Sequence, residues 1–102
     1  MDTSKSIVKH KKLFSTMGTK DPSKCKVIML NDNQTTQEFV VTMLIKVFGM
    51  EHNTAYNVMM KIHTSGRAIV YESSYDDCYS KVCEVEGIAR GNGFPLKVII
   101  EE

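Results

Sequence analysis

The sequence lacks tryptophan, has only two prolines, and contains no apolar run near the ~20 residues that a membrane-spanning helix requires. Its three cysteines form no Cys-x-x-Cys pair, and its glycines form no phosphate-binding loop ahead of a helix. The three histidines lack metal-ligand spacing, and no nucleophile lies in a catalytic motif. We therefore expect no membrane span, no metal or other cofactor, no catalytic residues and no enzymatic activity.

The charges divide the chain into two parts. Residues 1–26 hold seven lysines and two aspartates, a net charge of +5, while residues 27–102 hold six basic and ten acidic residues, a net charge of −4. The basic part is rich in Ser, Thr and Lys without apolar periodicity. We predict a flexible basic N-terminal extension over residues 1–25 and a single core domain over 26–102. The acidic core argues against a nucleic-acid surface there, although the extension leaves an RNA-binding module open.

The cysteine count favours a reduced compartment. Cys25, Cys78 and Cys83 are expected to be buried, structural thiols, because no second cysteine or metal-spaced histidine accompanies any of them. No secretory signal is recognisable at the N-terminus. We expect a bacterial cytoplasmic location, with the plastid stroma as the alternative.

Hydrophobic periodicity predicts the first half of the core. The β-branched run 26–30 indicates a strand, and the polar segment after it indicates a turn. Thr35 with Glu38 fits a capping box for a helix that Gly49 stops. A second helix is expected from near Asn53 to Gly66, with a very short connection to the first.

The second half follows the same alternation. Residues 67–71 predict a strand, which we place in the inner part of the sheet, and Ser73 or Ser74 can cap a third helix. That helix repeats its apolar residues at spacings of 4, 3 and 4, and a last strand follows Pro95. The order β-α-α-β-α-β predicts an α+β fold with a small three-stranded antiparallel sheet packed against three helices.

Two features could carry function. Asn31, Asp32 and Asn33 form a polar cluster at the end of the first strand, and His63 lies one helical turn after Met59. Taken alone, the cluster is typical of a turn, and the histidine of a structural residue. The strands lack the aromatic pattern of an RNA-binding platform. The residues themselves therefore indicate a small binding or adaptor domain with no identifiable ligand.

Three segments, in order, resemble the ClpS adaptor family: VIMLNDNQTTQEFVVTMLIKVFG, AYNVMMKIHTSGRAIV and KVCEVEGIARGNGFPLKVIIEE. The resemblance covers about three quarters of the chain, from Lys26 onward. It implies a monomeric adaptor that binds proteins beginning with Leu, Phe, Tyr or Trp, known as N-degron substrates. The adaptor delivers them to a Clp AAA+ unfoldase of the ClpA or ClpC type and binds neither nucleic acid nor membranes.

Carried over by position, the family's α-amino-binding residues fall on Asn31, Asp32, Asn33 and His63. The hydrophobic pocket falls on Thr35, Gln37, Val40, Met59 and Leu96, the unfoldase contact on Lys81, and the delivery tail on the extension.

The sequence departs from the family pattern at the pocket. Asn33 stands where the family has a second acid, Thr36 where it has a proline, and Gln37 where most members have a gate methionine. These changes predict weaker attraction for an ammonium group and an altered preference for the first residue. The alternative function is that of a ribosome-stalk-like interaction domain, which shares this fold but ignores free N-termini.

Overall fold

The structure of this protein is a computed structural model that describes residues 24–102. The predicted N-terminal extension lies outside the described residues, apart from its last two positions. None of the helices within residues 24–102 combines the length and the apolar character that a membrane span requires.

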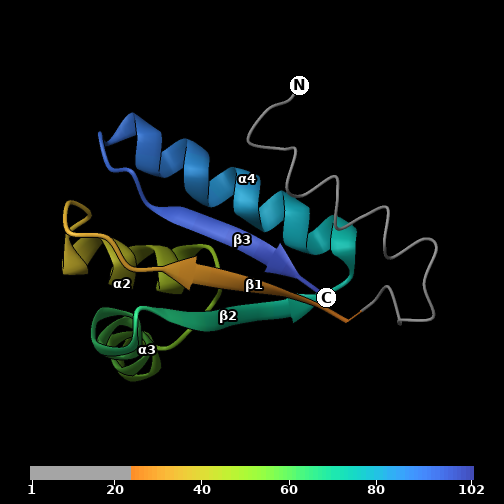
Figure 1. The fold of residues 1–102 in the computed structure, drawn as a ribbon, viewed down its shortest axis with the longest axis horizontal. Helices are drawn as coiled ribbons and strands as arrows, with labels where there is room; N and C mark the ends of the chain where they lie inside the picture. Colours follow the sequence, from red (N-terminus) through yellow and green to blue (C-terminus); the bar gives the residue numbers. More distant parts are fainter. Residues whose placement is uncertain (1–23) are drawn as a thin grey trace.

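In the described part of the chain, three strands and three helices follow one another in the predicted order, and both strand pairs are antiparallel. The α+β prediction is confirmed (Figure 1). The elements are β1 (Cys25–Leu30), α2 (Gln37–Lys46), α3 (His52–Ser65), β2 (Arg67–Ser73), α4 (Tyr75–Gly91) and β3 (Lys97–Glu101).

Strand β1 occupies the centre of the sheet, whose order is β2-β1-β3. The sequence prediction that residues 67–71 form an inner strand is therefore wrong, because β2 lies at the edge of the sheet formed by residues 24–102 and pairs there with β1. The error has a physical cause. The apolar pattern of β2 reflects a strand with one face against the helices, and that pattern is the same at the edge of a sheet as in its middle.

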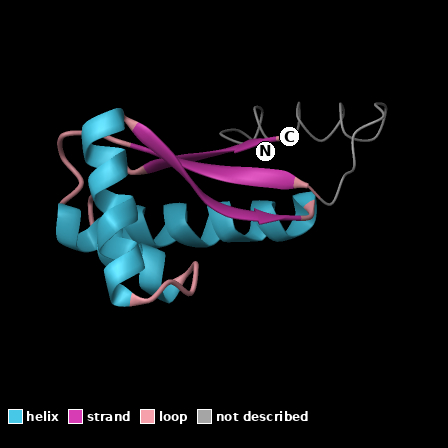
Figure 2. Ribbon diagram, turned by 90° about the horizontal axis from the view of Figure 1, so that it is seen from below, coloured by secondary structure: helices cyan, strands magenta, loops and turns pink. Residues whose placement is uncertain are grey.

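Helices α2, α3 and α4 lie on one side of the sheet, as Figure 2 shows most clearly for α4, the long helix that runs along the strands. Val27 and Met29 of β1 point to that side and are fully buried. They meet the apolar stripe of α4, whose predicted positions are all buried: Cys78, Val82, Val85 and Ala89. Because each element buries one face, its apolar residues recur about every 3.6 positions in the helix and every 2 positions in the strands.

A one-residue bulge in β2 turns Tyr71 toward the helices. Val27 pairs with Tyr71 and Ile28 pairs with Ile69, so Val70 has no partner in β1. Both Val70 and Tyr71 therefore face the helix-covered side, where the ring of Tyr71 packs 5.7 Å from the ring of Phe48. The bulge thus brings an aromatic ring against the end of α2.

The cysteines do not all share one environment. Cys25 and Cys78 are buried, as expected, but Cys83 is exposed on α4, so that part of the prediction is wrong. The helix period explains the difference. Cys83 follows the buried Val82 directly, and successive helical residues point about 100° apart.

Candidate functional site

The loop between β1 and α2 is folded around the carboxylate of Asp32. Its Oδ1 accepts hydrogen bonds from the backbone N–H groups of Gln34 and Thr35, at 2.8 and 2.7 Å. Its Oδ2 accepts a third from the hydroxyl of Thr35, at 2.8 Å. Three donors on one carboxylate fix the loop as an Asx-type turn. Asp32 therefore holds the loop in shape as well as placing a negative charge in it.

These bonds also decide which threonine caps α2. The sequence predicts Thr35 as the cap, but the hydroxyl of Thr35 donates its hydrogen bond to Asp32. Thr36 is the N-cap instead and accepts from the backbone N–H of Phe39 at 3.1 Å. With the cap one residue later, Glu38 no longer stands three positions after it. The predicted capping box is therefore absent.

The carboxyl of Asp32 stays ionised at neutral pH. Burial pushes its pKa upward, but the hydrogen bonds from Thr35 and Gln34 favour the charged form and outweigh burial, so the pKa lies below its ordinary value. The carboxylate lines an open surface hollow between this loop and α3. A fixed negative charge at such a place attracts cations.

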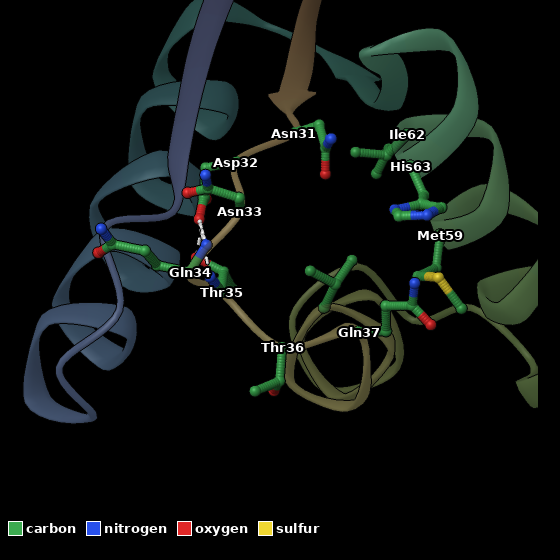
Figure 3. Close-up of a pocket in the computed structure, with 11 residues that line it drawn as sticks. Asn31, Asp32, Asn33, Gln34, Thr35, Thr36, Gln37, Met59, Ile62 and His63 are labelled. Atoms are coloured by element: carbon green, nitrogen blue, oxygen red, sulfur yellow. Dashed lines mark hydrogen bonds between the residues drawn. The ribbon is translucent and has the colours of Figure 1, made fainter.

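Asn31 and His63 lie on two sides of the same hollow. The backbone N–H of Asn31 donates to the carbonyl of Gly66 at 2.9 Å, which ties the end of β1 to the end of α3. Gly66 ends α3 with a φ of +94°, a conformation that glycine adopts without strain. Figure 3 shows the amide of Asn31 and the ring of His63 directed into the space between them.

Several polar side chains around the hollow are open to a ligand. Those of Asn31, Asn33 and His63 are exposed and make no hydrogen bond or ion pair within residues 24–102. An amide oxygen and an unprotonated imidazole nitrogen both accept hydrogen bonds. On Asp32, Oδ2 has a lone pair left after its bond from Thr35. Together these atoms could receive the three N–H donors of an ammonium group.

Below these polar groups the hollow becomes apolar. Val40, Met59 and Ile62 form this part of its wall, each less than a tenth exposed. Gln37, an exposed residue in the first turn of α2, lies beside Met59 (Figure 3). The volume of about 380 Å³ falls in the lower range of small-ligand sites. A polar mouth over an apolar recess suits a ligand with an ionic head and a hydrophobic side chain.

The fold brings most of the predicted site residues together here, but not all. The hollow is lined by Asn31, Asp32, Asn33, Thr35, Gln37, Val40, Met59 and His63 from the predicted set, with Gln34, Thr36 and Ile62 in addition. Leu96 is buried in the core and does not line the hollow. Lys81 lies on α4 and contacts the far end of α2. Ile62 was missed, although its place three residues after Met59 puts both on one helix face.

The chain is similar in sequence and in fold to known proteins of one family. The family model described as "ATP-dependent Clp protease adaptor protein ClpS" matches residues 20–99. The chain belongs to the ClpS adaptor family. A ClpS protein of Wolinella succinogenes is 40% identical over 82 residues, which cover 80% of each chain. One from Neisseria meningitidis is 37% identical and covers 88% of this chain and 87% of its own.

Among solved structures, Agrobacterium tumefaciens ClpS2 bound to L-phenylalaninamide has a TM-score of 0.76 and 37% identity to this chain. The match covers 79% of this chain and 98% of the other. Its ligand has a free α-amino group and an aromatic side chain. A ClpS protein that is 37% identical to this chain therefore binds a ligand of this kind.

Proposed function

We propose that this ClpS-family protein is an N-degron adaptor. It binds the free α-amino group and bulky hydrophobic first residue of a substrate, namely Leu, Phe, Tyr or Trp, and delivers that substrate to a Clp AAA+ unfoldase. The observation that carries the proposal is that one hollow contains both free hydrogen-bond acceptors, on Asn31 and His63, and an apolar recess. Lys81 and the N-terminal extension act in delivery, outside this hollow.

An α-amino group titrates at about 8, so at neutral pH it is mostly a cation with three N–H donors. In the proposed complex, Asn31 and His63 accept two of them, and Asp32 supplies the negative charge and a further acceptor. Asn33 contributes an amide where a carboxylate would add a second charge. Each charge-assisted bond contributes roughly 1.5 to 3 kcal/mol, and burial of the first side chain contributes about as much.

Selectivity follows from the same groups. An acetylated or internal residue has no cation and fewer donors, so the site's polar groups would be covered without partners. A charged first side chain would be buried in the recess against Val40 and Met59 at a large cost. After the entropy lost on binding, we expect an affinity near the micromolar range, about −8 kcal/mol.

The test is fluorescence anisotropy with a Leu-first peptide and its N-acetylated twin. We expect saturable binding of the free peptide and at least about a thirtyfold loss on acetylation, equivalent to some 2 kcal/mol. His63→Ala and Asp32→Ala should each weaken binding strongly. Thr64→Ala is the matched control, because within residues 24–102 its exposed hydroxyl donates only to the carbonyl of Met60 in its own helix.

Two outcomes would contradict the proposal. If neither peptide binds while a partner protein does, the chain acts as a stalk-like interaction domain. If both peptides bind equally, or both site variants bind like the wild type, the α-amino group is not recognised in this hollow.

A further inference from the structure

A second hollow adjoins the first along the surface of α2 and α3. Its volume is about 490 Å³, and Gln37 and Met59 line both hollows. Beyond this shared wall it is lined by Val41 and Ile45 of α2 and Tyr56 of α3. A ligand that fills the first hollow and continues over Gln37 and Met59 would therefore enter the second.

We propose that the second hollow binds the side chain of the third residue of the same substrate. This inference rests on the proposed N-degron function and extends it. In an extended peptide, side chains alternate between two sides, so the first and third point the same way and lie roughly 6 to 7 Å apart. With the first side chain in the recess, the second points to solvent and the third returns to the surface beyond Gln37.

The residues that line the second hollow favour an apolar side chain as its ligand. Tyr56 is 50% exposed, and Tyr56 and Ile69 are the large hydrophobic residues left exposed in the described part of the chain. Val41 and Ile45 are partly buried and add aliphatic surface. An aromatic or long aliphatic side chain would cover these groups and remove them from water.

A charged side chain beside the second hollow further restricts which third residues it accepts. Glu38 lines the second hollow on the α2 side and His52 on the α3 side. Glu38 is exposed and makes no ion pair within residues 24–102. Like charges placed close together repel, so an acidic third residue is disfavoured. The hollow thus distinguishes substrates that share the same first residue.

The test compares three Leu-first peptides that differ only at positions two and three: Leu-Gly-Phe, Leu-Gly-Gly and Leu-Phe-Gly, each followed by the same tail. We expect Leu-Gly-Phe to bind about fivefold more tightly than the other two, a difference near 1 kcal/mol. An aspartate at position three should bind more weakly than glycine.

Variants assign the effect to the hollow. Tyr56→Ala should bring the affinity ratio of Leu-Gly-Phe to Leu-Gly-Gly close to one, while Tyr56→Phe should retain the preference because it keeps the ring. Ile69→Ala is the matched control, because Ile69 is 49% exposed but lies on β2, and this variant should leave the ratio unchanged. A ratio near one in the wild type, with all three peptides bound, would overturn this inference alone. Failure of every Leu-first peptide to bind would overturn the N-degron proposal as well.

Discussion

The ammonium group of Lys81 on α4 donates a hydrogen bond of 2.8 Å to the carbonyl oxygen of Val47, which caps the C-terminal end of α2. The same group lies 5.4 Å from the centre of the Tyr71 ring. The helix dipole stabilises a cation at a helix C-terminus, and the electrons of an aromatic face attract a cation placed over it. Lys81 therefore links α4, α2 and β2. Of its three N–H donors, one makes a hydrogen bond within residues 24–102.

Replacing this lysine should reduce stability without disturbing peptide binding. Lys81→Met keeps the aliphatic stem but removes the bond to Val47, so we expect the free energy of unfolding to fall by about 1 to 3 kcal/mol in urea titrations. The hollow lies at the other end of α2, roughly 15 Å away along ten residues, so affinity for a Leu-first peptide should stay within about twofold. An unchanged unfolding curve would show that the bond to Val47 contributes nothing.

Asp32 should make stability depend on acid pH. Its pKa is lower in the folded protein than in the unfolded chain, so its stabilising effect is complete above the ordinary value of 3.8 and is lost as pH falls through the lowered pKa. At pH 7, Asp32→Ala should cost about 1 to 2 kcal/mol, because the loop loses an Asx cap. Urea titrations of both proteins at several pH values should show this difference shrinking below about pH 4. A difference independent of pH would contradict the assignment.

Gln37 should set the tolerance for the first residue. Its side chain stands beside Met59 at the wall shared by both hollows, at the position where the resemblance to the ClpS family implies a gate methionine. We expect the wild type to treat Ile-, Val- or Tyr-first peptides differently from Gln37→Met, with up to about a tenfold change in their affinities relative to Leu, or 1.4 kcal/mol. A peptide panel read by anisotropy measures this. The same ranking in both proteins, with the ordinary Leu, Phe, Tyr and Trp preference, would remove the role for Gln37.

Cys83 should be the thiol that reacts in the native protein. Burial raises the pKa of Cys78 to about 11, so that thiol stays protonated as well as covered, and Cys25 is buried too. A thiol reagent at pH 8 should modify one cysteine per chain quickly and the other two only after unfolding. In Cys83→Ser the fast phase should vanish. Rapid labelling of two or three thiols in the folded protein would show that the core opens on that timescale.

Much of the fold could be predicted from the sequence because it depends on near neighbours. The spacing of Cys78, Val82, Val85 and Ala89 specified a helix and its buried face, and the glycines at 49 and 66 marked helix ends. Where a distant or competing bond intervened, the prediction was wrong. Thr35 lost the cap of α2 to Thr36 because Asp32 took its hydroxyl.

For the candidate site, the sequence alone determined which residue types were available: an Asn-Asp-Asn cluster after a strand, a histidine near a helix end, and apolar residues at helical spacing. The resemblance of these segments to the ClpS family implied one ligand, a free α-amino group with a bulky hydrophobic first residue. Only the tertiary structure decided that Asn31 and His63 face one hollow, because the bond from Asn31 to Gly66 joins segments more than thirty residues apart. It alone placed Tyr56 beside Val41, since a groove between two helices exists only once they pack.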